Sequence, residues 1–134
     1  MLLKLRAGEK LYLNGDVIRV ERKATIELLN DATFLLEAHV MQADEANTPL
    51  RQLYFVLQTE LMERDAAPAA RKMFRAMLED TCAAFGRGVV GDRLGAAGAL
   101  AEAGRAFEAL KALRALFPLE ADLLAANPPQ PAAA

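Results

Sequence analysis

Ala46-Asn47-Thr48-Pro49 divides the chain into two halves with different hydrophobic patterns. Thr48 is a favourable helix N-cap, and Pro49 suits the first helical position because the N–H that proline lacks would have no partner there. Apolar residues recur at helical spacing from Leu50 to Leu61, whereas short alternating patterns precede the junction. The sequence therefore predicts an α+β protein with a strand-rich front half and a helical back half.

The front half, residues 1–47, is expected to form an antiparallel β sub-domain, either a small sheet or a small barrel. Apolar and basic residues alternate over residues 3–6. Asn14-Gly15 is the strongest short hairpin signal, because a type I′ turn needs a positive φ at both central residues. Further turn candidates are Glu21-Arg22-Lys23 and Asn30-Asp31. These turns predict sequential hairpins with one buried face.

The back half, residues 48–126, is expected to form a helical bundle of about four helices. A glycine- and alanine-rich third helix is expected to begin at Asp92 as its cap. Gly104 separates it from a fourth amphipathic helix, which Pro118 is expected to end, and Leu119–Ala126 could add a short turn of helix. The proline-rich tail, residues 127–134, is expected to be disordered.

Composition and charge limit the kinds of function available to the chain. Its 134 residues are 54% hydrophobic and 25% charged, as in folded soluble proteins, and its formal net charge is -2. Residues 1–48 hold six basic and eight acidic residues, and residues 49–134 hold ten of each. A surface that binds nucleic acid must therefore be a local basic patch. No apolar run is long enough to span a bilayer and no secretory pattern opens the chain, so a cytoplasmic location is expected.

No catalytic or metal-binding constellation can be assembled from the sequence. His39 is the only histidine and has no other ligand residues at metal-binding spacing, so a structural or surface role is favoured. Cys82 is the only cysteine and is expected to be a buried, inert thiol in a helix. Residues 86–91 match the GxGxxG pattern but follow a helix instead of a strand, which favours an inter-helix loop. We therefore expect no enzymatic activity, no cofactor and no metal site.

The basic residues of the front half support one hypothesis, an RNA-binding surface. Arg22 and Lys23 share a predicted hairpin tip, and Arg6 and Arg19 would share a solvated face if the first and third strands were neighbours. Tyr12 would offer a stacking surface for a base. The alternative is an ordinary solvated face with interleaved acidic residues. The candidate RNA-binding residues are Arg6, Lys10, Arg19, Arg22, Lys23 and Arg51.

The fourth helix supports a second hypothesis, a protein-binding groove. One side of this helix is apolar, and Arg114 is among the charged residues expected on its solvated side. The apolar residues either pack inside the fold or leave a groove for a partner helix. The candidate partner-binding residues are Phe107, Leu110, Leu113 and Phe117.

Five sets of residues together form a recognisable pattern. They are Gly8-Glu9-Lys10, then Asn14-Gly15-Asp16-Val17-Ile18-Arg19, then Ala46-Asn47-Thr48-Pro49, then Tyr54-Phe55 with Gln58, and last Glu102-Ala103-Gly104-Arg105 with Glu108-Ala109-Leu110-Lys111. In this order and spacing they resemble the FlbT family of flagellar biosynthesis regulators. The resemblance covers the chain up to about Leu119, although no single set is specific.

The resemblance implies a post-transcriptional regulator of flagellin synthesis in alphaproteobacteria. Family members are associated with the 5′ untranslated region of flagellin mRNA and with restraint of its translation until the flagellar hook is complete, and some act positively. The companion flagellar protein FlaF belongs to the same circuit. FlaF or flagellin is therefore the implied partner in the second hypothesis, in which the chain is an adaptor or chaperone-like module with indirect control of RNA.

Two segments depart from the family's pattern. Where members carry a turn like Gly-Asp-Arg-Arg, this chain has Val20-Glu21-Arg22-Lys23, which keeps only the basic pair. Where members read like Leu-Arg-Glu-Lys, this chain has Leu35-Leu36-Glu37-Ala38, so two positive charges are missing. These departures leave room for action through a protein partner.

Overall fold

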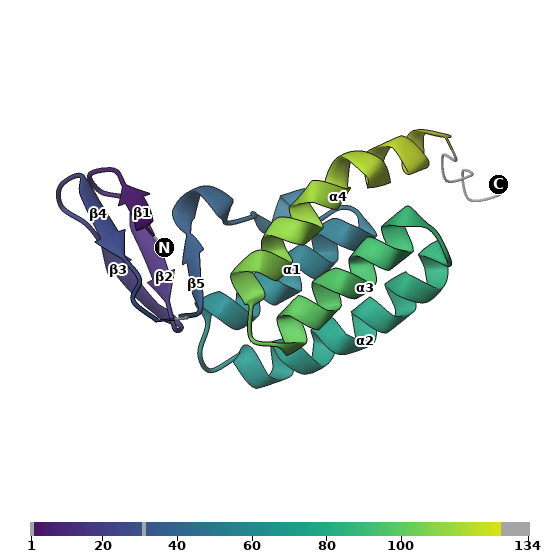
Figure 1. Cartoon of the computed structure of the whole chain (residues 1–134), viewed down its shortest axis with the longest axis horizontal. Helices are drawn as coiled ribbons and strands as arrows, with labels where there is room; N and C mark the ends of the chain where they lie inside the picture. Colours follow the sequence, from purple (N-terminus) through teal and green to yellow (C-terminus); the bar gives the residue numbers. More distant parts are fainter. Residues whose placement is uncertain (1, 31, 127–134) are drawn as a thin grey trace.

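The computed structural model describes residues 2–30 and 32–126, in which a strand-rich half lies beside four helices (Figure 1). The strands are β1 (Leu2–Leu5), β2 (Lys10–Leu13), β3 (Asp16–Arg19), β4 (Ala24–Glu27) and β5 (Phe34–Leu36). Two short 3₁₀ turns, η1 (Glu37–His39) and η2 (Ala43–Glu45), lead to α1 (Pro49–Met62), α2 (Ala67–Phe85), α3 (Val89–Glu102) and α4 (Ala106–Ala126). The predicted α+β class is confirmed. The tail expected to be disordered, residues 127–134, lies outside the described residues.

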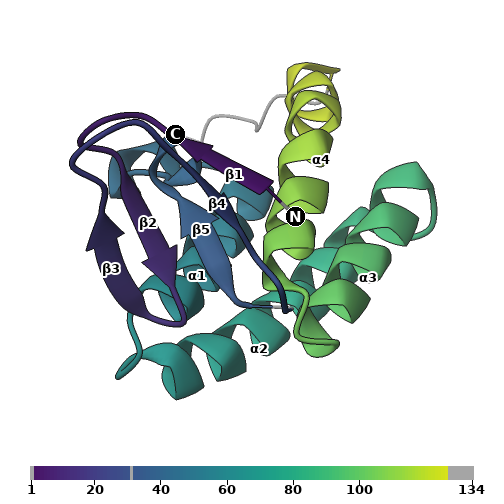
Figure 2. The ribbon, with the colours of Figure 1, turned by 60° about the vertical axis from the view of Figure 1, so that its left-hand side comes forward.

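The described strands form two small antiparallel sheets and no closed barrel (Figure 2). β1 pairs with β4, and β2 lies between β3 and β5, so the first and third strands are not paired neighbours. Leu3 and Leu5 of β1, Leu11 of β2 and Phe34 of β5 form a buried cluster. Only one of the expected sequential hairpins forms, because stacking the sheets buries the apolar face of each.

The predicted Asn14-Gly15 hairpin is confirmed. Both residues have positive φ, 51° and 83°, and Leu13 pairs with Asp16 across the turn. A Cβ on Gly15 would lie 3.0 Å from the Cβ of Arg64, so the left-handed backbone and the close approach both favour glycine. Arg64 also donates hydrogen bonds to the Asn14 carbonyl at 3.0 Å and to the Asp16 carboxylate at 2.8 Å. These bonds attach the hairpin to the connection between α1 and α2.

Strand β5 joins the two halves because its side chains alternate between two hydrophobic clusters. Phe34 and Leu36 pack in the cluster formed with β1 and β2, whereas Leu35 is fully buried in the helical core. The helical core takes residues from all four helices, including Leu50, Leu53, Leu57, Phe74, Leu94, Leu110, Leu113 and Leu116. Strand β5 is thus one link between the halves, together with Tyr12 of β2, which packs against the helical core, and the hydrogen bonds of Arg64 to the hairpin.

The Thr48-Pro49 junction begins α1, as predicted. The Oγ1 of Thr48 accepts the backbone N–H of Arg51 at 3.2 Å, and the proline occupies the first turn. A distant residue completes this cap: Glu120 of α4 is only 1% exposed and accepts the Leu50 N–H at 2.9 Å and the Thr48 hydroxyl. A carboxylate is stabilised at this position because free N–H groups and the helix dipole favour negative charge. Glu120 thereby connects the end of the last helix to the start of the first.

Helix α4 continues through Pro118, so the prediction that this proline ends the helix is wrong. A proline in a helix interior costs about 3 kcal/mol, because one hydrogen bond is lost and the ring crowds the preceding turn. Pro118 itself is exposed, whereas Leu116 and Glu120 on either side of it are buried. Burial of Leu116 in the core and the hydrogen bonds of Glu120 offset the local cost.

The GxGxxG match at residues 86–91 lies between α2 and α3, as the inter-helix interpretation predicted: residues 86–88 form the turn, and residues 89–91 begin α3. Gly86 and Gly88 have φ values of 67° and 142°, which end one helix and begin the next. Gly91 lies in the first turn of α3, where a Cβ would come within 2.1 Å of the Gly86 carbonyl oxygen. Helix α3 therefore begins ahead of Asp92, the expected cap, because the glycines let the two helices turn tightly.

We predict that Gly91→Ala lowers the free energy of unfolding by about 2 kcal/mol, because the turn must move to accept the methyl group. Gly95 is the matched control, since it lies on the same helix and nothing is within 4 Å of its Cβ position. Gly95→Ala should raise the free energy of unfolding by about 0.5–1 kcal/mol through helix propensity. Urea unfolding followed by circular dichroism measures both. Stabilisation by both substitutions would contradict the close approach.

Candidate nucleic-acid interface

Two turns at one end of the strand-rich half bring together five of the six predicted RNA-binding residues. The turn after β1 and the turn after β3 are joined by hydrogen bonds, from the Gly8 N–H to the Val20 carbonyl at 2.7 Å and from the Val20 N–H to the Glu9 carbonyl at 3.2 Å. Figure 1 shows both turns at the upper left of the molecule. We call the cationic residues of these turns and the adjoining strand ends the basic tip: Arg6, Lys10, Arg19, Arg22 and Lys23.

Strand register explains why these cations lie close together. Lys10 and Arg19 are direct partners in the β2–β3 ladder, and the β1–β4 ladder ends next to Arg6 and Lys23. Like charges directly opposite each other in an antiparallel ladder are destabilising. An anion bound near such a pair would relieve this repulsion, so the register favours a role in anion binding.

The basic tip has a positive local charge in a chain whose net charge is negative. Residues 6–10 and 19–23 contain five basic and two acidic residues, and Glu37 lies beside Lys10 as a third carboxylate, which leaves a local charge of +2. The Glu9 carboxylate accepts the Arg6 backbone N–H at 3.4 Å, and the Glu37 carboxylate accepts the Lys10 backbone N–H at 2.7 Å. Within the described residues, no ion pair includes a side chain of the basic tip. Its charged groups are therefore available to phosphates.

Two residues considered for RNA contacts lie elsewhere. Tyr12 is half-buried and packs against the helical core, so its ring is not an open stacking surface. Arg51 is half-buried at the start of α1, with its guanidinium carbon 4.7 Å from the centroid of the Phe117 ring. The fold does not bring Arg51 to the basic tip.

The four predicted partner-binding residues do not line one open groove. Leu110 and Leu113 are fully buried in the helical core, which is the packing alternative left open by the sequence. Phe107 stacks on Phe34 with the ring centroids 4.4 Å apart, and Phe117 is half-buried farther along α4. Only the two aromatic residues at the ends of this stripe reach the surface.

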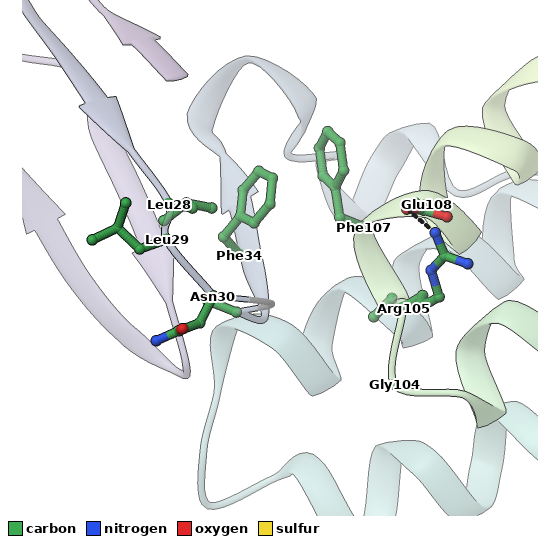
Figure 3. A pocket seen from close by; sticks show the side chains of 10 residues that line it. Leu28, Leu29, Asn30, Phe34, Gly104, Arg105, Phe107 and Glu108 are labelled. Carbon is green, nitrogen blue, oxygen red and sulfur yellow. Dashed lines mark hydrogen bonds and ion pairs between the residues drawn. The ribbon is translucent and has the colours of Figure 1, made fainter. Parts of the chain in front are cut away.

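A cleft of about 480 Å³ separates the strand-rich half from the start of α4. Figure 3 shows Phe34 and Phe107 side by side, with Leu29 beside the strands and the 2.7 Å Arg105–Glu108 ion pair on the helix. Leu29 is 84% exposed. The cleft is therefore a second candidate binding surface, and Phe107 is the only predicted partner-binding residue among those that line it.

The two side chains considered for catalysis, Cys82 and His39, are partly buried. Cys82 is half-buried against the helical core, and burial raises the pKa of its thiol, which keeps the thiol neutral. Burial, together with the nearby positive charge of Arg114, lowers the pKa of His39. No group of three potential metal ligands occurs among the described residues. None of the helices described has both the length and the apolar character needed to cross a membrane.

Sequence reasoning missed two buried polar residues that hold the connection between the halves. Gln58 of α1 is buried, and its side chain accepts the Met41 N–H at 2.6 Å and donates to the Met41 carbonyl at 2.8 Å. Glu120 forms the cap described above. Each lies four residues after a buried apolar residue, Tyr54 or Leu116. A polar residue on the apolar side of a helix was therefore the available signal.

Comparison with known proteins places the chain in a family. The family model described as "Flagellar protein FlbT" matches residues 1–124. A relative from Mesorhizobium japonicum is 47% identical over 98% of this chain and 89% of its own length, and one from Chelativorans sp. is 46% identical over 93% and 86%. A relative from Brucella ovis is 48% identical over 94% of this chain and 83% of its own length.

Each of these relatives is named a probable flagellum biosynthesis repressor protein FlbT, which is the name of a regulator and not of an enzyme. No solved structure matches the chain. Because the family model and the relatives cover nearly the whole sequence, the resemblance noted from its motifs is confirmed, and the chain belongs to the FlbT family of flagellar proteins.

Proposed function

We propose that the chain is a post-transcriptional regulator of flagellin synthesis, which binds the 5′ untranslated region of flagellin mRNA in the cytoplasm and represses its translation during flagellum assembly. The names of the relatives support a repressor of flagellum biosynthesis. The basic tip is the observation that supports RNA as the ligand, because five basic side chains without ion pairs gather on two joined turns.

Repression by this surface needs no covalent chemistry. The two turns hold each other through backbone hydrogen bonds, so the cations are presented on a preorganised support. Phosphates of a single-stranded leader bind to the charged groups, with the Lys10–Arg19 pair as the central contact. A protein bound in this way blocks access of the ribosome to the leader.

The double substitution Arg22→Ala/Lys23→Ala should weaken binding of flagellin leader RNA roughly tenfold at physiological salt. The slope of log affinity against log salt should become shallower by about 1.4, because each lost contact to a single strand contributes about 0.7. Gel-shift titrations at about 50 and 200 mM salt measure both quantities.

Arg87→Ala/Arg93→Ala is the matched control, because it removes two exposed cations, one in the turn between α2 and α3 and one in the first half of α3. This control should keep the wild-type affinity. An Arg22→Ala/Lys23→Ala protein with unchanged affinity and salt slope would rule out the basic tip as the RNA surface.

The cleft beside Phe107 favours a second candidate function, an adaptor that acts through FlaF or flagellin and controls RNA indirectly. Leu29 is a large apolar side chain exposed to solvent, and such a side chain is suited to contact a partner protein. Leu29→Ser should leave folding unchanged and reduce co-purification of FlaF or flagellin severalfold, while RNA binding persists. Wild-type recovery of both partners by this variant would contradict the adaptor function of the cleft.

A further inference from the structure

The two arginines that are shielded from solvent lack a carboxylate partner. Four exposed arginines of the described chain form ion pairs: Arg64, Arg71, Arg75 and Arg105. Arg51 and Arg114 are half-buried instead, and neither forms an ion pair within residues 2–30 and 32–126. Partial burial removes water from a charge and normally requires a compensating partner. Arg51 and Arg114 are thus the half-buried arginines of the described chain, and neither has a carboxylate partner there.

Both arginines line the same pocket, of about 240 Å³, between η1, the first turns of α1 and the middle of α4. The ring of Phe117 supports Arg51 at 4.7 Å, and Tyr54 lies edge-on to that ring with the centroids 5.7 Å apart. This stacking orients the Arg51 guanidinium while leaving its N–H groups at the edge of the plane. Two cations from different helices therefore converge on one small space.

His39, which also lines this pocket, has a buried polar atom without a partner in the described part of the chain. Its Nδ1 is buried and forms no hydrogen bond within residues 2–30 and 32–126. The hydroxyl of Tyr54 donates to the His39 carbonyl at 2.6 Å, which holds the backbone of the histidine in place. Burial, opposed by the charge of Arg114, raises the pKa of Tyr54, so this hydroxyl stays protonated. The backbone of His39 is thus held in place, while its Nδ1 has no hydrogen bond in the described part of the chain.

One carboxylate also lines the pocket, that of Glu45 in η2. Its Oε1 accepts the backbone N–H of Gln42 at 3.0 Å, and it forms no ion pair with Arg51 or Arg114. Two guanidinium groups against one carboxylate leave the pocket positive. This balance favours an anionic ligand.

We propose that the pocket binds a phosphate group, with Arg51 and Arg114 as its charged ligands. Arginine suits phosphate because its planar array of N–H donors matches the phosphate oxygens. The pocket is smaller than the roughly 300–1,000 Å³ that encloses a drug-sized ligand, so it fits one phosphate-sized group. The phosphate belongs either to an RNA chain or to a free nucleotide. This site is separate from the basic tip and does not depend on the function proposed above.

His39 is the only histidine, so its imidazole proton resonances report on the pocket without ambiguity. The full chain is titrated with inorganic phosphate, with uridine monophosphate and with a single-stranded RNA, and the His39 resonances are followed by NMR. We expect each resonance to shift on binding and the pKa of His39 to rise, because a negative charge beside an imidazole favours its protonated form.

Arg114→Gln should weaken phosphate binding roughly tenfold, because it removes a charge-assisted contact. Lys111→Gln is the matched control, since Lys111 is an exposed cation on the same helix, and it should bind like the wild type. Glu45→Gln should bind more tightly, because it removes the opposing charge and keeps an oxygen for the Gln42 N–H. Circular dichroism checks the fold of each variant, and Arg51→Gln replaces Arg114→Gln if the latter fails to fold.

The three ligands identify the source of the phosphate. If the His39 resonances shift with inorganic phosphate and with uridine monophosphate, the ligand is a free phosphate group. If they shift with the single-stranded RNA alone, the ligand is a phosphate of an RNA chain. The RNA titration is repeated with Arg22→Ala/Lys23→Ala, which separates this pocket from the basic tip. The proposal is overturned if His39 responds to none of the three ligands, or responds equally in Arg114→Gln and wild type.

Discussion

Replacing Glu120 with alanine is expected to lower the free energy of unfolding by about 4 kcal/mol. The carboxylate is 1% exposed and accepts the Leu50 N–H at 2.9 Å and the Thr48 hydroxyl. The buried Leu50 N–H that loses its partner costs about 1–3 kcal/mol, and loss of the hydrogen bond from the Thr48 hydroxyl costs about 1 kcal/mol more. The space left by the side chain adds to this loss.

Two further substitutions separate the causes of this effect. Glu120→Gln keeps an oxygen acceptor and removes the charge, so a smaller loss of about 1–2 kcal/mol is expected. Glu108→Ala removes an exposed carboxylate of α4 that pairs with Arg105, and a change within about 0.5 kcal/mol is expected. Denaturant unfolding followed by circular dichroism gives all three values. Similar small losses for Glu120→Ala and Glu108→Ala would show that the cap contributes little.

The cap of Glu120 also matters for the arginine pocket. Glu120 holds α4 against the start of α1, and these two helices supply Arg114 and Arg51. Glu120→Ala should therefore also disturb the His39 resonances without any ligand, because the wall of the pocket moves. The stability of the fold and the geometry of the pocket depend on the same contact between the first and last helices.

Leu35→Ala is expected to lower the free energy of unfolding by about 3 kcal/mol, as large-to-small changes in cores do. Leu35 is fully buried in the helical core, whereas Tyr12 of β2 packs against that core only partly buried. Its neighbours Phe34 and Leu36 pack in the other cluster and cannot take its place without reversing the strand. The substitution should therefore weaken the attachment of the strand-rich half to the helices.

Two tyrosines allow this uncoupling to be measured. Tyr12 lies in β2 where it contacts the helical core, and Tyr54 lies inside that core in α1, so their ring resonances report on the contact between the halves and on the helices during denaturant unfolding. In wild type the two transitions should coincide, whereas Leu35→Ala should shift the Tyr12 transition to lower denaturant. Leu29→Ala is the control, because Leu29 is exposed, and a change within about 0.5 kcal/mol is expected. Coincident transitions with an unchanged midpoint in Leu35→Ala would contradict this role of β5.

The elements whose causes lie within a few residues were predictable from the sequence. The hairpin at Asn14-Gly15 needs two positive φ angles, and the start of α1 needs only the local chemistry of Thr48 and Pro49. The apolar stripe of α1 was equally clear, because every one of its predicted residues is buried. For the candidate interface, the sequence showed the basic residues of the front half, but strand pairing and register decided which of them lie together. The same sequence signals also indicated the family.

The remaining features depend on contacts between residues far apart in the chain. Pairing of β1 with β4 follows from stacking two apolar sheet faces, which no local turn specifies. Helix α4 passes Pro118 because Glu120 is bound at the start of α1, some 70 residues away in the sequence. Arg114 was expected in solvent and instead lies in a pocket with Arg51. The Thr48-Pro49 junction thus begins α1 through local chemistry. The packing of distant segments determines which residues contact that helix start, Glu120 of α4 among them.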